Sequence, residues 1–366
     1  MSGTEHFQIE DGILKKYTGN ALNVVVPIGV THIEDMAFYH CSHINKITLP
    51  EGLKSIGCAA FSGCSSLSVI SIPNSVKKIG AEAFEHTGIT DIILPENLKS
   101  IPFGCFFNCK NLTTIVLPNN VMTISAEAFH RCGSLRSVTL STGLKSIGKY
   151  AFHACGNLKE ISIPESVLKI DAGAFEGCHA LTSVTLANNL TKIGQGAFRN
   201  CRGLTELKVP GSVVKIAQSA FANCSELKAV FMESGVVDIE DGAFSACDKL
   251  ESLQIPSSVV KIGNRAFSFC KKLTSVDIPA GVTKIGMEVF CGCSSLTSVF
   301  IPKGVTHIGI GAFCACTDLT DIYISDCVKS IGSQAFEGCP NLTIHAPADS
   351  FSQIYAKENN IPFIAE

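Results

Sequence analysis

The sequence has no tryptophan and only 5 tyrosines, yet its 366 residues include 22 phenylalanines. Phe, Tyr and Trp normally share the task of filling protein cores. An aromatic set made almost entirely of Phe therefore needs a specific cause. The spacing of the phenylalanines along the chain supplies that cause.

The chain also lacks a strong charge and any long apolar run. Its net charge is 29 − 32 = −3, which is too balanced to indicate a nucleic-acid partner. No apolar run approaches the ~18 residues of a membrane-spanning helix, so we expect no membrane insertion. The N-terminal stretch MSGTEHFQIEDGILKK has no basic segment followed by an apolar one, so it is not a secretory signal. As written, the sequence predicts a cytoplasmic location, unless a signal was removed.

Signatures of catalysis are missing as well. The chain contains no nucleophile elbow, P-loop, H-E-x-x-H or paired C-x-x-C motif. Serine and aspartate are plentiful, but they fall at variable positions of the repeat described next. We therefore expect no enzyme activity and no cofactor.

The phenylalanines mark a repeat of 23 residues. Fourteen of them stand in one column at steps of 23, with a single step of 22 between Phe84 and Phe106. The fifth residue before each of these phenylalanines is always Ile, and the residue directly before it is Ala in 12 of 14 copies. The third residue after it is Cys in 13 of 14, with Thr87 as the exception. The column consists of Phe38, Phe61, Phe84, Phe106, Phe129, Phe152, Phe175, Phe198, Phe221, Phe244, Phe267, Phe290, Phe313 and Phe336.

These columns have a physical interpretation. Segments such as SVTL alternate with period two and are β-branched, which predicts strands, and a Pro usually ends each one. A second short segment, V-x-x-I-G, and an A-F-x-x-C turn close the coil. One coil cannot bury its own apolar edge, whereas stacked coils can. The chain exceeds the ~250–300 residues of a single compact core, which also favours an elongated architecture. The sequence therefore predicts a right-handed, mostly β solenoid of about 14 repeats with short turns.

The repeat unit L-x-x-V-x-I-P-x-x-V-x-x-I-G-x-x-A-F-x-x-C resembles the 23-residue leucine-rich repeats of BspA-like surface proteins over residues 22–345. Residues 1–21 and 346–366 resemble the N-terminal and C-terminal caps of that family. In the C-terminal cap, Ser350 is expected to N-cap a short helix carrying Phe351, Ile354 and Tyr355. The resemblance implies a leucine-rich-repeat solenoid capped at both ends. It also implies adhesion or protein recognition, a cell-surface or secreted location, and no catalytic residues.

One residue of each longer strand is expected to face a partner. If these strands line a concave surface, the residue between the two inward strand positions points onto it. In the first eight coils this residue is small or aliphatic, and later ones are larger, charged or aromatic. Exposed aromatic side chains are typical interface hot spots, although sheet faces also favour them for packing alone. The predicted partner-binding residues are Phe231, Gln254, Asp277, Phe300, Tyr323 and His345.

A row of lysines stands six residues before the phenylalanine column. Like charges stacked about 5 Å apart repel each other, so this row must be solvated. It either docks an anionic surface or glycan, or only keeps this flank soluble and protects it from aggregation. Its members are Lys78, Lys169, Lys192, Lys215, Lys261 and Lys284.

Thirteen of the 18 cysteines fall in the column after the phenylalanine. Free cysteine behaves as a small buried residue with a weak donor, so we interpret the column as a structural ladder whose thiols satisfy main-chain carbonyls. Two cysteines outside it, Cys291 and Cys314, directly follow column phenylalanines in adjacent coils. Their Cα atoms should lie about 5 Å apart, within the range of a disulfide.

His130, His153 and Glu176 occupy one variable position in three consecutive coils. Imidazole and carboxylate groups suit a divalent transition metal, which makes this trio a weak metal-site candidate. The alternative is a row of solvated polar side chains, because nothing in the repeat supplies partners that would orient the ligands.

These observations favour a non-enzymatic, adhesin-like protein-recognition module. It would bind a protein or glycoprotein partner on the concave sheet face, through its C-terminal half, as a monomer. An intracellular scaffold protein using the same surface is one alternative. A thiol-rich metal-binding or redox protein is the other.

Overall fold

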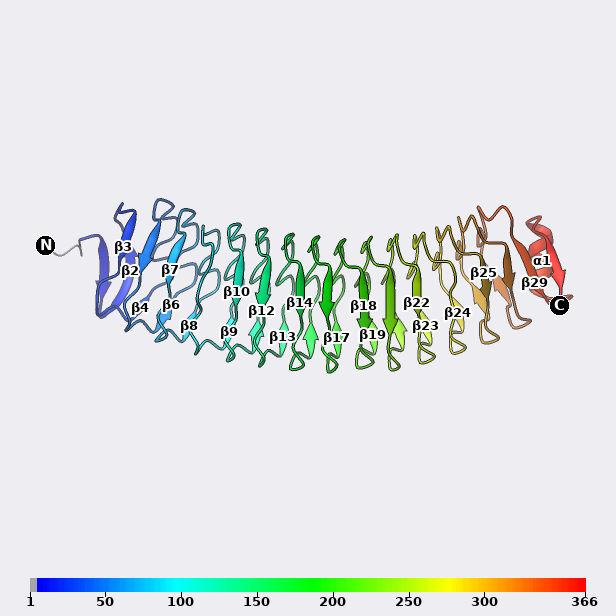
Figure 1. Ribbon diagram of the computed structural model, residues 1–366, viewed down its shortest axis with the longest axis horizontal. Helices are drawn as coiled ribbons and strands as arrows, with labels where there is room; N and C mark the ends of the chain where they lie inside the picture. The colour runs from blue at the N-terminus through cyan, green and yellow to red at the C-terminus, as the bar shows by residue number, and fades with distance from the viewer. Residues whose placement is uncertain (1–4) are drawn as a thin grey trace. The chain divides into compact units, whose positions relative to one another are not determined.

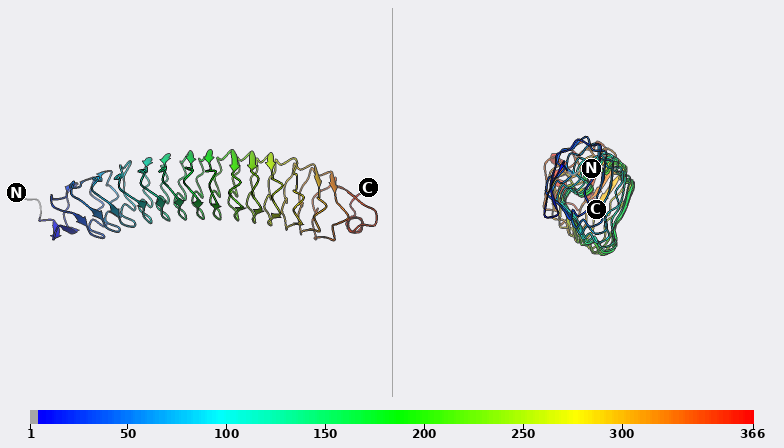
Figure 2. Two further views of the ribbon diagram at one scale, coloured as in Figure 1. Left: turned by 90° about the horizontal axis from the view of Figure 1, so that it is seen from below. Right: turned by 90° about the vertical axis from the view of Figure 1, so that its left-hand side faces the viewer.

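A computed structural model describes residues 5–366, so residues 1–4 of the expected N-terminal cap lie outside the described residues. The chain divides into two compact units, Met1–Ala187 (unit 1) and Asn188–Glu366 (unit 2). Each unit holds seven of the column phenylalanines. Each is a β-solenoid whose coils follow one another in chain order, as Figures 1 and 2 show.

In unit 1, a typical repeat forms a longer strand, then a two-residue strand, then the A-F-x-x-C turn. The central residue of a longer strand points inward while its neighbours point out, because successive strand side chains alternate between faces. Strands pair in parallel with their equivalents in the next coil, as Ile47 does with Ile70. The 22-residue step contains the one repeat of unit 1, at residues 91–95, whose longer segment forms no strand.

The elements of unit 1 are as follows. The longer strands are β3 Asn23–Val25, β5 Lys46–Thr48, β7 Val69–Ser71, β10 Thr114–Val116, β12 Ser137–Thr139, β14 Glu160–Ser162 and β16 Ser183–Thr185. The two-residue strands are β4 His32–Ile33, β6 Ser55–Ile56, β8 Lys78–Ile79, β9 Ser100–Ile101, β11 Thr123–Ile124, β13 Ser146–Ile147 and β15 Lys169–Ile170.

Strands β1 (Phe7–Glu10) and β2 (Ile13–Tyr17) form an antiparallel hairpin before the first repeat. Strand β2 pairs in parallel with β4 and so covers the first edge of the two-residue strands. Its Tyr17 stacks on Phe38 with ring centroids 5.2 Å apart, and Phe7 packs against Tyr17 in turn. The hairpin therefore supplies the first aromatic ring of the stack that the repeats continue.

The core of unit 1 is a stack of phenylalanine rings. From Phe38 to Phe175, successive rings lie 5.0–5.6 Å apart, and each of the seven rings is fully buried. Offset stacking of this kind adds to the free energy of burying the rings. The stack explains the aromatic composition, because only a ring of one size and no polar tip fits every coil.

Main-chain hydrogen bonds join each A-F-x-x-C turn to the next. In the coil around Phe38, the N–H groups of Met36, Phe38 and His40 donate to carbonyls of the following coil at 2.8–2.9 Å. Residues two before and two after the phenylalanine often have positive φ, as Met36 and His40 do. The turn therefore presents three donors on the side that faces the next coil.

Close packing of coils accounts for part of the glycine column. A Cβ on Gly80 would lie 2.4 Å from the main-chain nitrogen of Cys58 in the preceding coil, nearer than real Cβ atoms approach. Any larger residue there requires the two coils to separate locally.

Unit 2 repeats the same design. Its rings from Phe198 to Phe336 stack at 5.3–5.7 Å. The longer strands are β18 Glu206–Val209, β20 Ala229–Met232, β22 Ser252–Gln254, β25 Ser298–Phe300, β27 Asp321–Tyr323 and β29 Thr343–Ala346. The two-residue strands are β17 Lys192–Ile193, β19 Lys215–Ile216, β21 Asp238–Ile239, β23 Lys261–Ile262, β24 Lys284–Ile285, β26 His307–Ile308 and β28 Ser330–Ile331.

The end of unit 2 is covered by helix α1 (Phe351–Glu358) and strand β30 (Phe363–Ala365). Ser350 caps the helix as expected, its side chain accepting a hydrogen bond from the N–H of Gln353. Tyr355 is buried against Phe336, whereas Phe351 and Ile354 are exposed, so the helix holds the core through one of the three expected side chains. Strand β30 pairs in parallel with β29 and covers the last edge of the longer strands.

Truncating one ring tests how far the stack stabilises unit 2. The variant Phe221→Ala removes a ring with no exposed surface, and we expect a loss of ~3–5 kcal/mol in the free energy of unfolding. Urea denaturation followed by circular dichroism measures it. The control is Phe269→Ala, which truncates an exposed ring and should cost no more than about 0.5 kcal/mol. Equal losses in the two variants would contradict a core built on the stack.

Candidate interaction surface

The third residue of each longer strand forms an outward row on the sheet face. In unit 2 the strand register places Lys208 beside Phe231 and Phe231 beside Gln254. All three side chains are exposed, and Phe231 retains 43% of its surface. In unit 1 the hydrophobic members of the row, such as Val25, Ile93 and Val116, are aliphatic. The sequence predicts a change along this row from small or aliphatic side chains to larger, charged or aromatic ones. In these coils the residues that change are exposed.

Phe300 on β25 and Tyr323 on β27 form an aromatic pair in which Phe300 is exposed and Tyr323 is half-buried. Their ring centroids lie 4.3 Å apart with the planes 7° from parallel, and Phe300 is 65% exposed. Asp277 precedes them in the row and is exposed, in a segment between β22 and β25 that forms no strand. A flat apolar pair beside a carboxylate can bind an apolar group and a polar group of one partner together.

His345 departs from the expectation. It is only 9% exposed, so the prediction of an exposed side chain is wrong here. Its ring stacks under Tyr323 at 4.5 Å, while Nε2 lies 2.8 Å from Asp321 Oδ1 and Nδ1 lies 3.2 Å from Glu366 Oε1. Strand β30 pairs Ile364 with His345, and Glu366 follows directly after this strand. His345 therefore supports Tyr323 from the adjacent strand β29.

Hydrogen bonds near the row lower the pKa values of two carboxyl groups. The side chain of Thr320 first, and then that of His345, lower the pKa of Asp321. At the other end of the row, Lys208 Nζ lies 2.8 Å from Glu233 Oε1 and is the main cause of the lowered pKa of Glu233, aided by the N–H of Gly211. These carboxylates keep their charge at neutral pH.

The lysine row is partly neutralised in unit 2. Asp238 stands in the same column as the lysines, and its Oδ2 lies 3.7 Å from Lys215 Nζ and 3.5 Å from Lys261 Nζ. It is nearly buried, at 7% exposure. The sequence shows an aspartate at this position of the repeat. The prediction of a lysine row considered only the lysines and therefore missed the ion pairs that Asp238 makes.

The cysteine column forms the ladder that the sequence predicts. Cys64 and Cys132, for example, donate from Sγ to the carbonyl of the column phenylalanine in the preceding coil at 3.1 Å. At the one exception, Thr87 Oγ1 donates to the carbonyl of Phe84 instead and contacts Cys109 Sγ. Burial raises the pKa of Cys64 and Cys178, among others, to about 12, so these thiols stay protonated at neutral pH.

Cys291 and Cys314 are joined by a disulfide, with their Cα atoms 4.6 Å apart. The bond links two adjacent coils of unit 2. Each cysteine directly precedes a turn residue with positive φ, Gly292 or Ala315, so the covalent link spans neighbouring turns.

His130 and His153 contact each other directly, with His153 Nδ1 3.0 Å from His130 Nε2. Burial, and then the charges of His153 and Arg131, lower the pKa of His130 to about 4. Burial also lowers the pKa of His153, partly opposed by the charge of Glu176. Among residues 5–366, no group of three or more His, Cys, Asp or Glu side chains is arranged to hold a metal ion. The structure thus brings the imidazoles together as a hydrogen-bonded pair.

The geometry defines a solenoid of leucine-rich repeats with an exposed, chemically varied sheet face. The family model for the BspA-type leucine-rich repeat region matches residues 31–159, 99–228, 145–271 and 215–343. These matches together span most of the chain, so the protein belongs to the BspA-type leucine-rich repeat family, a family of protein-recognition modules. A comparison with curated proteins gives no match.

Solved structures share the fold across nearly the whole chain. A leucine-rich repeat protein from Bacteroides ovatus is 28% identical, with a TM-score of 0.77 over 99% of this chain and 96% of that one. A leucine-rich cell surface protein from Faecalibacterium prausnitzii is 27% identical, with a TM-score of 0.52 over 97% and 96%. The pneumococcal vaccine antigen PcpA, at 18% identity and a TM-score of 0.54 over 97% and 91%, shares the fold alone. Over the described part of the chain, no helix has the length and apolar character needed to cross a membrane.

Thiol reactivity tests the ladder. Only the thiolate reacts quickly, so buried thiols with raised pKa values should resist an aromatic disulfide reagent at pH 8, while the exposed Cys58 reacts. Titration of the native protein, before and after adding denaturant, measures this difference. The variant Cys58→Ser should lose the fastest phase. Fast reaction of the buried ladder thiols in the native protein would contradict the structural interpretation.

The histidine pair predicts a pH dependence. The unfolded His130 takes up a proton near pH 6.5, whereas the folded one resists protonation down to about pH 4. The unfolded state therefore binds more protons in this window, and stability should fall as the pH drops through it. The variant His130→Asn should flatten the plot of melting temperature against pH between 6.5 and 4. The control His307→Asn changes an exposed histidine and should leave the slope unchanged.

Proposed function

We propose that this chain is a non-enzymatic, adhesin-like recognition module that binds a protein or glycoprotein partner as a monomer. The contact surface is the outward row of unit 2: Phe231, Gln254, Asp277, Phe300 and Tyr323. The observation that carries this proposal is the stacked pair Phe300–Tyr323, which leaves Phe300 65% exposed.

The fixed positions of the Phe300 and Tyr323 rings support the proposed role of this surface in binding. Each ring stands on a paired strand, and Tyr323 stacks on His345 of the adjacent strand, which is itself fixed by Asp321 and Glu366. A rigid aromatic anchor loses little conformational entropy on binding, which is why such residues dominate interface hot spots. Around the anchor, Gln254 and Asp277 provide the polar rim typical of recognition surfaces.

Two observations favour a location outside the cytoplasm. The Faecalibacterium relative, 27% identical over nearly the whole chain, is described as a cell surface protein. The Cys291–Cys314 disulfide is a bond that persists in oxidising environments and is rare in the cytosol. An intracellular scaffold would use the same sheet face but would keep these two cysteines reduced.

The double variant Phe300→Ala/Tyr323→Ala tests the surface. We expect it to lose at least about 30-fold in partner affinity, because hot-spot truncations cost about 2 kcal/mol or more. The melting curve should stay nearly unchanged, since both rings lie outside the buried stack. Affinity capture from the native setting, quantified by mass spectrometry for the wild type and the variant, identifies the partner and measures the loss.

The matched control is Val116→Ala, which truncates an exposed residue of the same row in unit 1. It should leave partner capture unchanged. If the control and the double variant lose partners equally, or if the double variant unfolds, the aromatic pair is structural and the proposal fails.

A further inference from the structure

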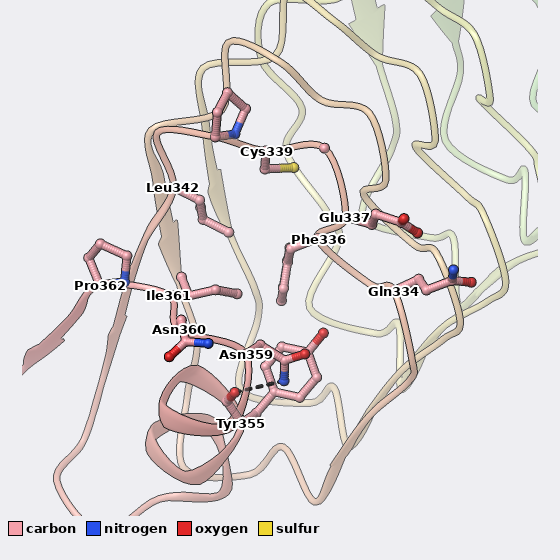
Figure 3. Close-up of a pocket in the computed structure, with 12 residues that line it drawn as sticks. Gln334, Phe336, Glu337, Cys339, Leu342, Tyr355, Asn359, Asn360, Ile361 and Pro362 are labelled. Carbon is pink, nitrogen blue, oxygen red and sulfur yellow. Dashed lines mark hydrogen bonds between the residues drawn. The ribbon is translucent and has the colours of Figure 1, made fainter.

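The end of unit 2 contains a cavity of about 440 Å³ between the last A-F-x-x-C turn and the C-terminal cap. Figure 3 shows Phe336, Leu342, Tyr355 and Ile361 around it, with polar residues at its margin. This volume falls in the range of sites that bind small ligands or peptide side chains.

Three main-chain donors beside this cavity have no acceptor. In the preceding coil, the N–H groups of Gly311, Phe313 and Ala315 donate to carbonyls of the last coil at 3.1, 2.8 and 2.6 Å. The equivalent donors of the last coil belong to Gln334, Phe336 and Gly338. Across residues 5–366, no main-chain or side-chain acceptor bonds to any of the three. All three residues line the cavity.

The aromatic stack also ends here. Phe313 stacks on one side of Phe336 with planes 13° apart, but on the cap side Tyr355 meets it at 77° and 5.9 Å. Phe336 is 5% exposed, whereas the preceding rings of the column are fully buried. No ring therefore occupies the parallel position that a following coil would fill.

The cap explains this gap. Strand β30 extends the longer-strand sheet after β29, and α1 packs against β28, β29 and β30. Neither element supplies a turn that could accept the three N–H groups. Unpaired main-chain donors at the edge of a repetitive array are a template for adding another chain segment.

The charge of the residues that line the cavity limits the chemical class of ligand that it can bind. Glu337 is the one charged residue among those that line it, and none is cationic. A negatively charged ligand would be repelled by Glu337, so the three donors suit neutral carbonyl oxygens. The apolar floor at Phe336, Leu342 and Tyr355 suits an aromatic side chain on the same ligand.

We propose that this cavity, here called the end site, binds a turn-forming polypeptide segment of a partner protein. Three carbonyls of the segment accept from the N–H groups of Gln334, Phe336 and Gly338, and an aromatic side chain packs on Phe336. The contacts within unit 2 show the required arrangement: Gln218, Ala220 and Ala222 accept from Gly196, Phe198 and Asn200 at 3.0, 2.8 and 2.9 Å. The end site is separate from the outward row and does not depend on the function proposed for it.

The probe is a blocked peptide with the sequence of residues 216–223, IAQSAFAN. It carries the three accepting carbonyls and the column phenylalanine. Hydrogen exchange with mass spectrometry, performed on the full chain, should show exchange of the segment around 334–338 slowed at least about threefold when peptide is added, because bound amides are protected. The same peptide with serine in place of Phe221 should bind about tenfold more weakly.

Two variants provide the control. Pro340→Trp places a large side chain at the exposed rim of the end site and should abolish the peptide effect. Thr317→Trp makes the matched change in the preceding coil and should leave it intact. Melting curves of both variants establish that they fold.

Three outcomes would overturn the proposal. The first is unchanged exchange at 334–338 when the peptide is added, and the second is equal protection by the serine and phenylalanine peptides. The third is protection of 334–338 that rises with protein concentration in the absence of peptide, which would assign the site to a second copy of this chain. Loss of the effect in Pro340→Trp but not in Phe300→Ala/Tyr323→Ala separates the end site from the outward row.

Discussion

The A-F-x-x-C turn of this chain cannot complete its own hydrogen bonds. In the coil around Phe38, three N–H groups point away from the coil that carries them, and only the next coil brings carbonyls into reach. A buried main-chain donor without a partner costs free energy comparable to a lost hydrogen bond, so one coil is unstable by itself. The same turn places the phenylalanine where a neighbouring ring must cover it. Stability in each unit thus comes from contacts between successive coils, and the two ends need separate solutions.

The two ends solve this problem differently. At the start of unit 1, Tyr17 provides both a ring for Phe38 and an N–H that donates to the carbonyl of Ala37. At the end of unit 2, Tyr355 provides an edge-on ring and no main-chain acceptor. The difference follows from chain direction, because turns donate toward the C-terminal side and accept on the N-terminal side. A hairpin strand satisfies the accepting side readily, while a helix packed on the donating side does not.

The repeated interior was predictable from the sequence, since column residues such as Phe221 and Cys132 meet the same surroundings in every coil. Surface features depend on contacts between unlike positions, and these were harder to predict. His345 holds the row position of an exposed residue, but β30 and Glu366 cover it from a part of the chain outside the repeat. Asp238 stands in the lysine column and pairs with lysines of both neighbouring coils. The sequence indicates this contact only when the same repeat position is compared between neighbouring coils. The histidine pair was placed correctly in adjacent coils, although its direct hydrogen bond required side-chain geometry.

The strand register within unit 2 has a consequence for how such a surface can change. Because each coil meets its neighbours through the same rings, thiols and main-chain groups, an in-frame duplication or loss of one whole repeat would leave every interior contact type intact. On the outside, the same event would move Phe231 and the Phe300–Tyr323 pair apart or together by one strand spacing, roughly 4.8 Å. Gain or loss of whole repeats therefore changes the distance between surface recognition residues in steps of one strand spacing, while the interior contacts stay the same.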